Sequence, residues 1–175
     1  MLFRSMSYQV YRTELDVEVL RSLLSYEPMT GALRWIERPS RGVAIGDLAG
    51  FITSVGYRSI RIRGASYQAH RLAWLHNYGE WPTGDLDHIN GIKSDNRIVN
   101  LRDVSRAVNC QNIRHAQRDN ASGFLGVSLP KKGRKWVAQI YHDGKKRTIG
   151  YFITPEQAHE AYLAAKRENH PGCTL

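Results

Sequence analysis

The sequence contains little cysteine, and the two cysteines that it has are far apart. Cys110 and Cys173 are the only ones among 175 residues, and neither belongs to a CxxC pair. A disulfide framework requires several closely spaced cysteines, and a zinc-thiolate site requires paired ones. We therefore expect neither a cross-linked secreted domain nor a zinc site built on thiolates.

Long hydrophobic runs are missing as well. No stretch approaches the roughly 20 apolar residues of a membrane-spanning helix. The first ten residues, MLFRSMSYQV, lack an apolar core followed by a small-residue cleavage site, so we expect a protein of the host cytoplasm. Internal repeats and low-complexity tracts are also absent. The 42% of apolar residues suffices for the core of one ordinary domain or two small ones.

Acidic residues are in the minority, with 16 Asp and Glu against 25 Lys and Arg. The formal net charge is +9, and more than half of it falls after residue 119, where PKKGRKW and GKKR lie close together. Such clustering favours an anionic polymer as partner. Because no basic amphipathic helix carries the charge, nucleic acid is favoured over a membrane surface.

Several local signals predict the N-terminal elements. Thr13 is placed to cap a helix through ELDVEVLRSLLSY. GYRSIRIRGASYQAH predicts a hairpin that turns at Arg63-Gly64. HRLAWLHNYGEWP predicts a short helix that Gly79 and Pro82 end.

Residues 85–112, DLDHINGIKSDNRIVNLRDVSRAVNCQN, are crowded with Asp, His and Asn. Asn is weak inside helices and strands because its side chain competes for backbone hydrogen bonds. LDHI and NLRDV predict two short strands that flank a loop. SRAVNCQNIRHAQR predicts a helix with Ser105 as its cap. The segment is therefore either an elaborate loop or a functional site.

Three side chains in this segment suit hydrolytic chemistry. The Asp87 carboxylate and the Asn109 amide are hard oxygen donors, which favour Mg²⁺ or Mn²⁺ over zinc. His88 titrates nearest neutrality and is able to take a proton from an attacking water. Neighbours on a strand point to opposite faces, so Asp87 and His88 serve one site only if the strand ends or bends there. A merely solvated Asp-His pair and a Ca²⁺-binding loop remain alternatives, although the ligand order differs from an EF-hand.

HRLAW followed by LDHINGIKSDNRIVNLRDVSRAVNCQN resembles the HNH endonucleases of phages and mobile introns. The resemblance covers residues 30–115 and rests on several spaced elements that agree in order. It implies a ββα-metal fold that hydrolyses DNA phosphodiesters.

By position, the resemblance assigns His88 as the general base and Asp87 as the metal-binding acid. Asn100 corresponds to the central Asn, which braces the loop through backbone hydrogen bonds. The final motif His is replaced by Asn109, as in the homing-endonuclease branch, and this favours oxygen-bound Mg²⁺, with Mn²⁺ as the alternative. His70 and Arg71 are assigned either phosphate contact or structural support. Asn90, Asp95, Asn96 and Asn112 are assigned to the loop and to helix capping.

The C-terminal part predicts three strands and one helix. FLGVSL, KWVAQIY and KRTIGYF are separated by turn-forming stretches, and Asp143-Gly144 is a strong hairpin signal. Thr154 caps the helix TPEQAHEAYLAAKREN, with Pro155 first and Gln157 closing a capping box. Residues 118–123, RDNASG, mark the boundary before this unit.

This part resembles the AP2 DNA-binding domain over residues 121–172, through Gly126-Val127, KWVAQI, IGYF and Ala161-Tyr162. Such domains read the major groove with the sheet face that lies away from the helix. Alternation directs Trp136, Ala138 and Ile140 to the helix. The residues expected to contact DNA are Ser128, Lys132, Gln139, Tyr141, Lys146 and Thr148. The alternative is an ordinary solvated face, and the scarcity of Arg there leaves the sequence preference open.

We therefore predict an α+β protein with a ββα-metal (HNH) nuclease core, then a three-stranded antiparallel sheet plus one helix. The predicted domains are an N-terminal helical segment (1–28), the nuclease (29–117) and the AP2-like domain (121–175). The predicted function is metal-dependent endonuclease action on double-stranded DNA by a monomer without a small-molecule cofactor. The alternatives are a non-catalytic DNA-binding regulator on an inert HNH scaffold, and a structural or RNA-binding accessory protein.

Overall fold

The computed structural model describes residues 15–131 and 133–175. Contacts divide the chain into two compact units. The first comprises the chain up to His88 together with Ile92–Asp103, and the second comprises Ile89–Gly91 and Val104–Leu175. A division by contacts is not a division by function, so the predicted domains 1–28, 29–117 and 121–175 stay a proposal. The predicted cap Thr13 and the predicted DNA contact Lys132 lie outside the described residues.

The first unit begins with helix α1 (Val17–Leu23), capped by the Asp16 side chain, which accepts from the Glu18 amide at 2.7 Å. The sequence predicted a helix that continued to Tyr26, and this is wrong. Leu24 is already extended and opens strand β1 (Leu24–Glu27), which pairs antiparallel with β2 (Ala32–Trp35). Sheet pairing overrides the helical pattern here because it buries Leu24 completely.

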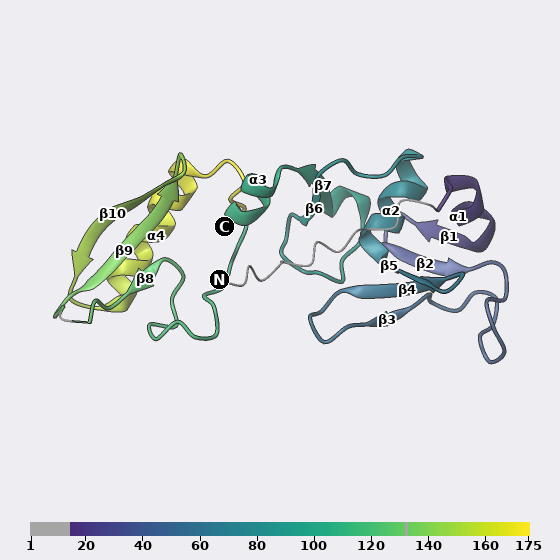
Figure 1. The fold of residues 1–175 in the computed structure, drawn as a ribbon, viewed down its shortest axis with the longest axis horizontal. Helices are drawn as coiled ribbons and strands as arrows, with labels where there is room; N and C mark the ends of the chain where they lie inside the picture. The colour runs from purple at the N-terminus through teal and green to yellow at the C-terminus, as the bar shows by residue number, and fades with distance from the viewer. Residues whose placement is uncertain (1–14, 132) are drawn as a thin grey trace, which may run out of the picture. The chain divides into compact units, whose positions relative to one another are not determined.

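A second sheet of the first unit has the order β3-β4-β5, formed by Phe51–Ile52, Arg58–Ile62 and Ala65–Gln68 (Figure 1). The predicted turn at Arg63-Gly64 is confirmed, and both residues have positive φ, as the tightest hairpin turns require. Helix α2 (Ala69–Tyr78) follows and ends at the left-handed Gly79, as predicted. Its buried face joins α1 and β4 in one core, whose fully buried members include Leu20, Ile60 and Leu72.

The polar segment forms strand β6 (Asp85–His88), the 3-10 turn η1 (Ile98–Asn100), strand β7 (Leu101–Val104) and helix α3 (Arg106–Gln111). β6 and β7 pair in a two-stranded sheet. The predicted order of strand, loop, strand and helix is confirmed, and so is the Ser105 cap. The helix is shorter than predicted. Residues after Gln111 leave it, and there Asn112 and the Ile113 carbonyl bond with Thr174 and Lys166 instead.

The second unit contains a three-stranded antiparallel sheet with the order β10-β9-β8, formed by Lys145–Phe152, Trp136–His142 and Val127–Ser128. Helix α4 (Pro155–Asn169) lies along one face of this sheet (Figure 1). Thr154 caps it by accepting from the Gln157 amide, as predicted. Gly126 approaches the helix so closely that a Cβ would lie 2.1 Å from the Tyr162 ring. The protein is thus a mixed α+β chain, and no helix in the described ranges is long and apolar enough to cross a membrane.

Candidate active site at the end of strand β6

His88 is the last residue of β6, and only 4% of it is exposed. The strand begins in a fixed position because Asp103, on β7, accepts from the Thr83 and Gly84 amides at 2.8 Å each. Residues 86–88 are all buried, which is unusual for a sequence that reads Leu-Asp-His. Burying an acid and a histidine side by side costs free energy unless both find partners.

The His88 ring is surrounded by side chains from three other segments. Its Nε2 lies 3.3 Å from the Asn96 side-chain oxygen. The His70 ring centroid, on α2, is 5.0 Å away in an edge arrangement, and the Tyr57 ring centroid is 5.9 Å away. Lys93 places its ammonium 5.0 Å from the centre of the Tyr57 ring. A proton on Nε2 that bonds to Asn96 fixes the tautomer in which Nδ1 carries the lone pair.

Both histidines are held in the neutral form. Burial lowers the pKa of His88, against the smaller opposing effects of Asn96 and Asp87. Burial, with smaller contributions from the neighbouring His88 and Arg71, lowers the pKa of His70 to about 3. A neutral imidazole is the form that accepts a proton, so His88 is in the correct state for a general base at neutral pH.

Asp87 forms an ion pair that the sequence did not reveal. Nε and Nη2 of Arg102, on β7, both donate to Asp87 Oδ2, at 2.9 and 2.7 Å. Asp87 is 7% exposed, so the pair compensates much of the cost of burying the carboxylate. The two strands were predicted, but their pairing, which brings Arg102 near Asp87, comes from the structure.

The loop between the two strands is rigid because its polar side chains bond to the backbone. Asn100 donates to the Asp95 carbonyl at 2.8 Å, which is the contact that a loop-bracing role requires. Asp95 also accepts from the Arg97 guanidinium, at 2.6 and 2.8 Å. The Tyr26 hydroxyl donates to the Asn96 carbonyl at 2.9 Å. The backbone of Asn96, whose side chain contacts His88, is therefore held in place.

Asn96 was assigned to the loop alone, and the structure gives it a further contact. It is 2% exposed and touches His88, eight residues earlier in the chain. Tyr57, whose ring lies beside His88, and Lys93, whose ammonium lies over the Tyr57 ring, were likewise missed. No pattern in the sequence connects Tyr57 with His88, because the contact depends on how β4 and α2 pack.

Asn109 lies on α3, which belongs to the second unit, and its assignment as a ligand stays a prediction. Among the residues that the structure describes, no three or more His, Cys, Asp and Glu side chains gather in a metal-binding arrangement. The predicted donor pair includes only one residue of these types. The chemistry of its donors, one carboxylate and one amide oxygen, fits a hard divalent cation.

His70 and Arg71 are both buried, at 8% and 7% exposed. The Arg71 guanidinium lies 5.8 Å from the centre of the Trp81 ring, and its Nη2 donates to the Pro82 carbonyl at 3.5 Å. Of the two roles predicted for these residues, burial favours structural support over phosphate contact.

On the second unit, the open face of the sheet carries most of the predicted DNA contacts. Cross-strand partners share a face, and Lys146 pairs with Tyr141 while Thr148 pairs with Gln139. Ser128, Lys146 and Thr148 are exposed, and Tyr141 is 65% exposed. Trp136, Ala138 and Ile140 pack with α4 residues, so the predicted division of faces is confirmed. A shift of register after Thr148 adds Tyr151 to the open face, where it is 66% exposed.

Residues 67–111 match the family model described as HNH endonuclease. The comparisons with curated proteins and with solved structures gave no match. The matched stretch begins just before α2 and ends with α3, so it includes His70, Asp87, His88, Asn100 and Asn109. The segment that holds the buried Asp-His pair therefore matches an HNH endonuclease domain, which supports a DNA nuclease.

Proposed function

We propose that the protein is a divalent-metal-dependent endonuclease of the homing or phage type that hydrolyses phosphodiester bonds in double-stranded DNA. One observation carries this proposal. A neutral histidine, buried at the end of β6 beside an acid and oriented by Asn96, lies inside the segment that matches the HNH model. A surface loop that merely solvates an Asp-His pair would not bury both side chains.

In the proposed reaction, His88 accepts the proton of a water molecule that attacks the scissile phosphorus. Asn96 keeps the imidazole in one tautomer and orientation, and Asn100 keeps the loop rigid. Asp87 and Asn109 would hold Mg²⁺, or alternatively Mn²⁺. When bound, the ion supplies positive charge that stabilises the phosphorane-like transition state and the leaving oxygen. Arg102 stabilises the buried Asp87 carboxylate in the metal-free protein.

The C-terminal unit would position the nuclease on DNA through the open face of its sheet. The proposed contacts are Ser128, Gln139, Tyr141, Lys146 and Thr148, together with Lys132. The exposure of Ser128, Tyr141, Lys146 and Thr148 and the seven Lys and Arg between residues 131 and 147 support this role. The likeness to AP2 domains rests on the sequence. The protein would act on DNA as a monomer and without a small-molecule cofactor.

A second candidate is a non-catalytic DNA-binding regulator on an inert HNH scaffold. The observation that favours it is the ion pair between Arg102 and Asp87, which already occupies one oxygen of the only proposed acidic ligand. The nuclease requires that a cation compete successfully with Arg102, whereas the regulator does not.

Incubation of the protein with supercoiled plasmid separates the two candidates. We expect nicked or linear product with Mg²⁺ or Mn²⁺ and none with EDTA. Asp87→Asn, which keeps the shape and removes the charge, should abolish cleavage while DNA binding in EDTA persists. If the parent binds DNA but no divalent ion among Mg²⁺, Mn²⁺, Ca²⁺ and Zn²⁺ supports cleavage, the regulator is the better description.

A further inference from the structure

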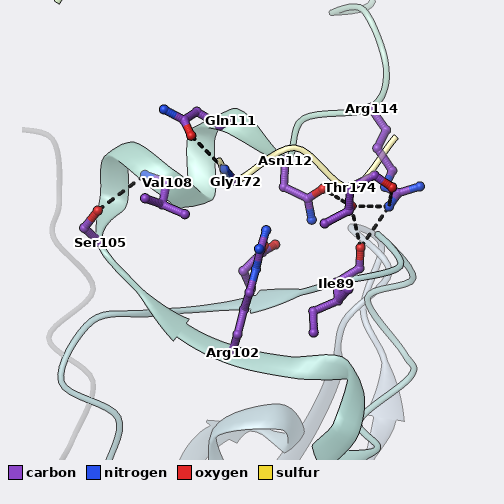
Figure 2. A network of polar contacts seen from close by, with 10 residues as sticks. Ile89, Arg102, Ser105, Val108, Gln111, Asn112, Arg114, Gly172 and Thr174 are labelled. Atoms are coloured by element: carbon purple, nitrogen blue, oxygen red, sulfur yellow. Dashed lines mark hydrogen bonds and ion pairs between the residues drawn. The ribbon is translucent and has the colours of Figure 1, made fainter. Parts of the chain in front are cut away.

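The last described residues of the chain return to α3, and the contacts there are all within the second unit. The Gly172 amide donates to the Gln111 side-chain oxygen at 2.9 Å. The Thr174 hydroxyl lies 2.7 Å from the Ile89 carbonyl oxygen and 2.5 Å from the Asn112 side-chain oxygen. Figure 2 shows this strand of chain crossing beside α3, with Thr174 between Asn112 and Ile89.

Arg114 bonds to the same carbonyl. Its Nη2 lies 2.8 Å from the Ile89 oxygen and 3.0 Å from the Thr174 carbonyl oxygen, and it also bonds to the Thr174 hydroxyl (Figure 2). The Ile89 carbonyl therefore accepts from the Arg114 guanidinium and from the Thr174 hydroxyl. These two residues are 60 positions apart in the sequence. Ile89 directly follows His88 in the chain.

The returning segment also packs without space. A Cβ on Gly172 would lie 2.4 Å from the Val108 carbonyl oxygen and 2.9 Å from Val108 Cγ1. A Cβ on Gly91 would lie 2.6 Å from Arg114 Cδ. Such close packing leaves the returning segment no room to move relative to α3.

The segment is anchored before it reaches α3. His170 Nε2 lies 2.6 Å from the Tyr141 carbonyl oxygen, at the end of β9. Lys166, 1% exposed on α4, donates to the Ile113 carbonyl. Helix α4 is thus hydrogen-bonded to a residue that follows α3, and the sheet is hydrogen-bonded to the first residue of the returning segment.

We propose that residues 170–174, here called the C-terminal clamp, position the catalytic groups of the nuclease. Thr174 and Arg114 are the positioning residues. They hold the carbonyl that follows His88 and, through Asn112, the helix turn that follows Asn109. This inference rests on the proposed function and adds to it, because it gives the C-terminal unit a part in the chemical step in addition to DNA binding.

The test compares Thr174→Val, which keeps the shape and removes the hydroxyl, with Thr174→Ser, which keeps the hydroxyl. Leu175→Ala, next along the chain, is the control. Three quantities are measured in the full chain: the single-turnover cleavage rate at saturating DNA with Mg²⁺, the DNA Kd in EDTA, and amide hydrogen exchange over residues 106–112. Gly172→Ala provides a second, steric variant.

For Thr174→Val we expect the cleavage rate to fall by about 3-fold to 100-fold, from a lost hydrogen bond and a displaced catalytic group. The DNA Kd should stay within about twofold, and exchange over α3 should accelerate. Thr174→Ser should restore the rate, and Leu175→Ala should match the parent. Gly172→Ala should repeat the valine result.

Three results overturn the clamp. One is a parental rate in Thr174→Val, whether or not exchange over α3 changes. Another is an equal loss in the serine and valine variants. The third is a rate loss that saturating DNA removes. A parent that never cleaves DNA overturns the proposed function instead, and exchange over residues 106–112 then decides whether the clamp holds α3.

Discussion

The two compact units differ in where they place the polar side chains proposed for function. In the first unit, Asp87, His88, Asn96 and Asn100 are each less than 8% exposed, within a network of side chain and backbone bonds. In the second unit, Tyr141 and Tyr151 are about two-thirds exposed on an open sheet face, with Lys146 and Thr148 exposed beside them.

The difference separates two kinds of polar function. Burial fixes geometry and moves a pKa, which a reacting group needs and a binding surface does not. The charges on an open face stay hydrated. Their attraction for DNA phosphates extends over a shorter distance as the salt concentration rises. Substitutions in the first unit should therefore change rates and acid stability, whereas substitutions on the sheet should change affinity and sequence preference.

The largest expected effect is that of His88→Ala. Loss of the general base should lower the cleavage rate by about 10²–10⁴ at saturating DNA. The DNA Kd in EDTA should change little, because the His88 ring is buried and is not one of the proposed DNA contacts. His115→Ala is a matched control, since His115 is exposed. A variant that cleaves at the parental rate would remove His88 from the mechanism.

The next effect concerns acid stability. The pKa of His70 is about 3 in the folded protein, below its ordinary value of 6.5. As pH falls below 6.5, the unfolded chain takes up the proton first, so stability is lost from pH 6.5 down to about 3. His70→Phe should remove about 2 kcal/mol of the stability difference between pH 7 and pH 5.

Urea unfolding at the two pH values measures this change. Some pH dependence should remain in His70→Phe, because burial also lowers the pKa of His76 and His88. Identical pH slopes for parent and variant would show that the neutral ring of His70 does not contribute.

A smaller effect is expected for Gln139→Ala on the sheet. The Gln139 amide donates to the Thr148 hydroxyl at 3.3 Å, which orients it on the exposed face. An oriented amide is able to read a base edge, worth about 1–3 kcal/mol of discrimination. Selection of bound sequences from a random DNA pool should give a different preference for the variant. The same preference in both proteins would mean that Gln139 does not read DNA bases and has only a structural role in the sheet.

The smallest effect is expected for Lys146→Ala. Loss of one phosphate contact should reduce the slope of log K against log salt by about 0.9. It should also weaken binding to many DNA sequences to a similar extent. Lys145→Ala is the matched control, because neighbours on a strand point to opposite faces and Lys145 pairs with His142. Binding isotherms between 50 and 300 mM salt measure both slopes (roughly the range over which phosphate contacts dominate). Equal slopes for Lys146→Ala and the parent would contradict phosphate contact.

Elements specified by nearby residues were predictable from the sequence. Thr154, Pro155 and Gln157 determine where α4 begins, and Asp143-Gly144 determines the hairpin of β9 and β10. The alternation of β9 identified the face that packs on α4. These features were correct because each depends on fewer than ten consecutive residues.

Features that depend on distant packing were not predictable. Strand β1 replaces the last turn of a predicted helix because Leu24 pairs with Trp35. Around His88, Asp87 and Asn96 were visible in the motif, whereas Tyr57 comes from 31 residues earlier and has no motif of its own. The assignment of α3 was correct in type and wrong in length, since Thr174 and Lys166 bond to the residues that follow it.

The hydrogen bond from Thr174 to the Ile89 carbonyl also has a consequence for biosynthesis. The two residues are 85 positions apart. A ribosome that adds 5–20 residues per second needs roughly 4–17 s to make Thr174 after it has made Ile89. A nascent chain that has already brought Asn96, His70 and Tyr57 around His88 still lacks Thr174, which bonds to the carbonyl of the next residue. If the clamp positions the proposed nuclease, an incomplete chain should cleave DNA more slowly than the finished one, and the full rate should appear only after Thr174 has been synthesised.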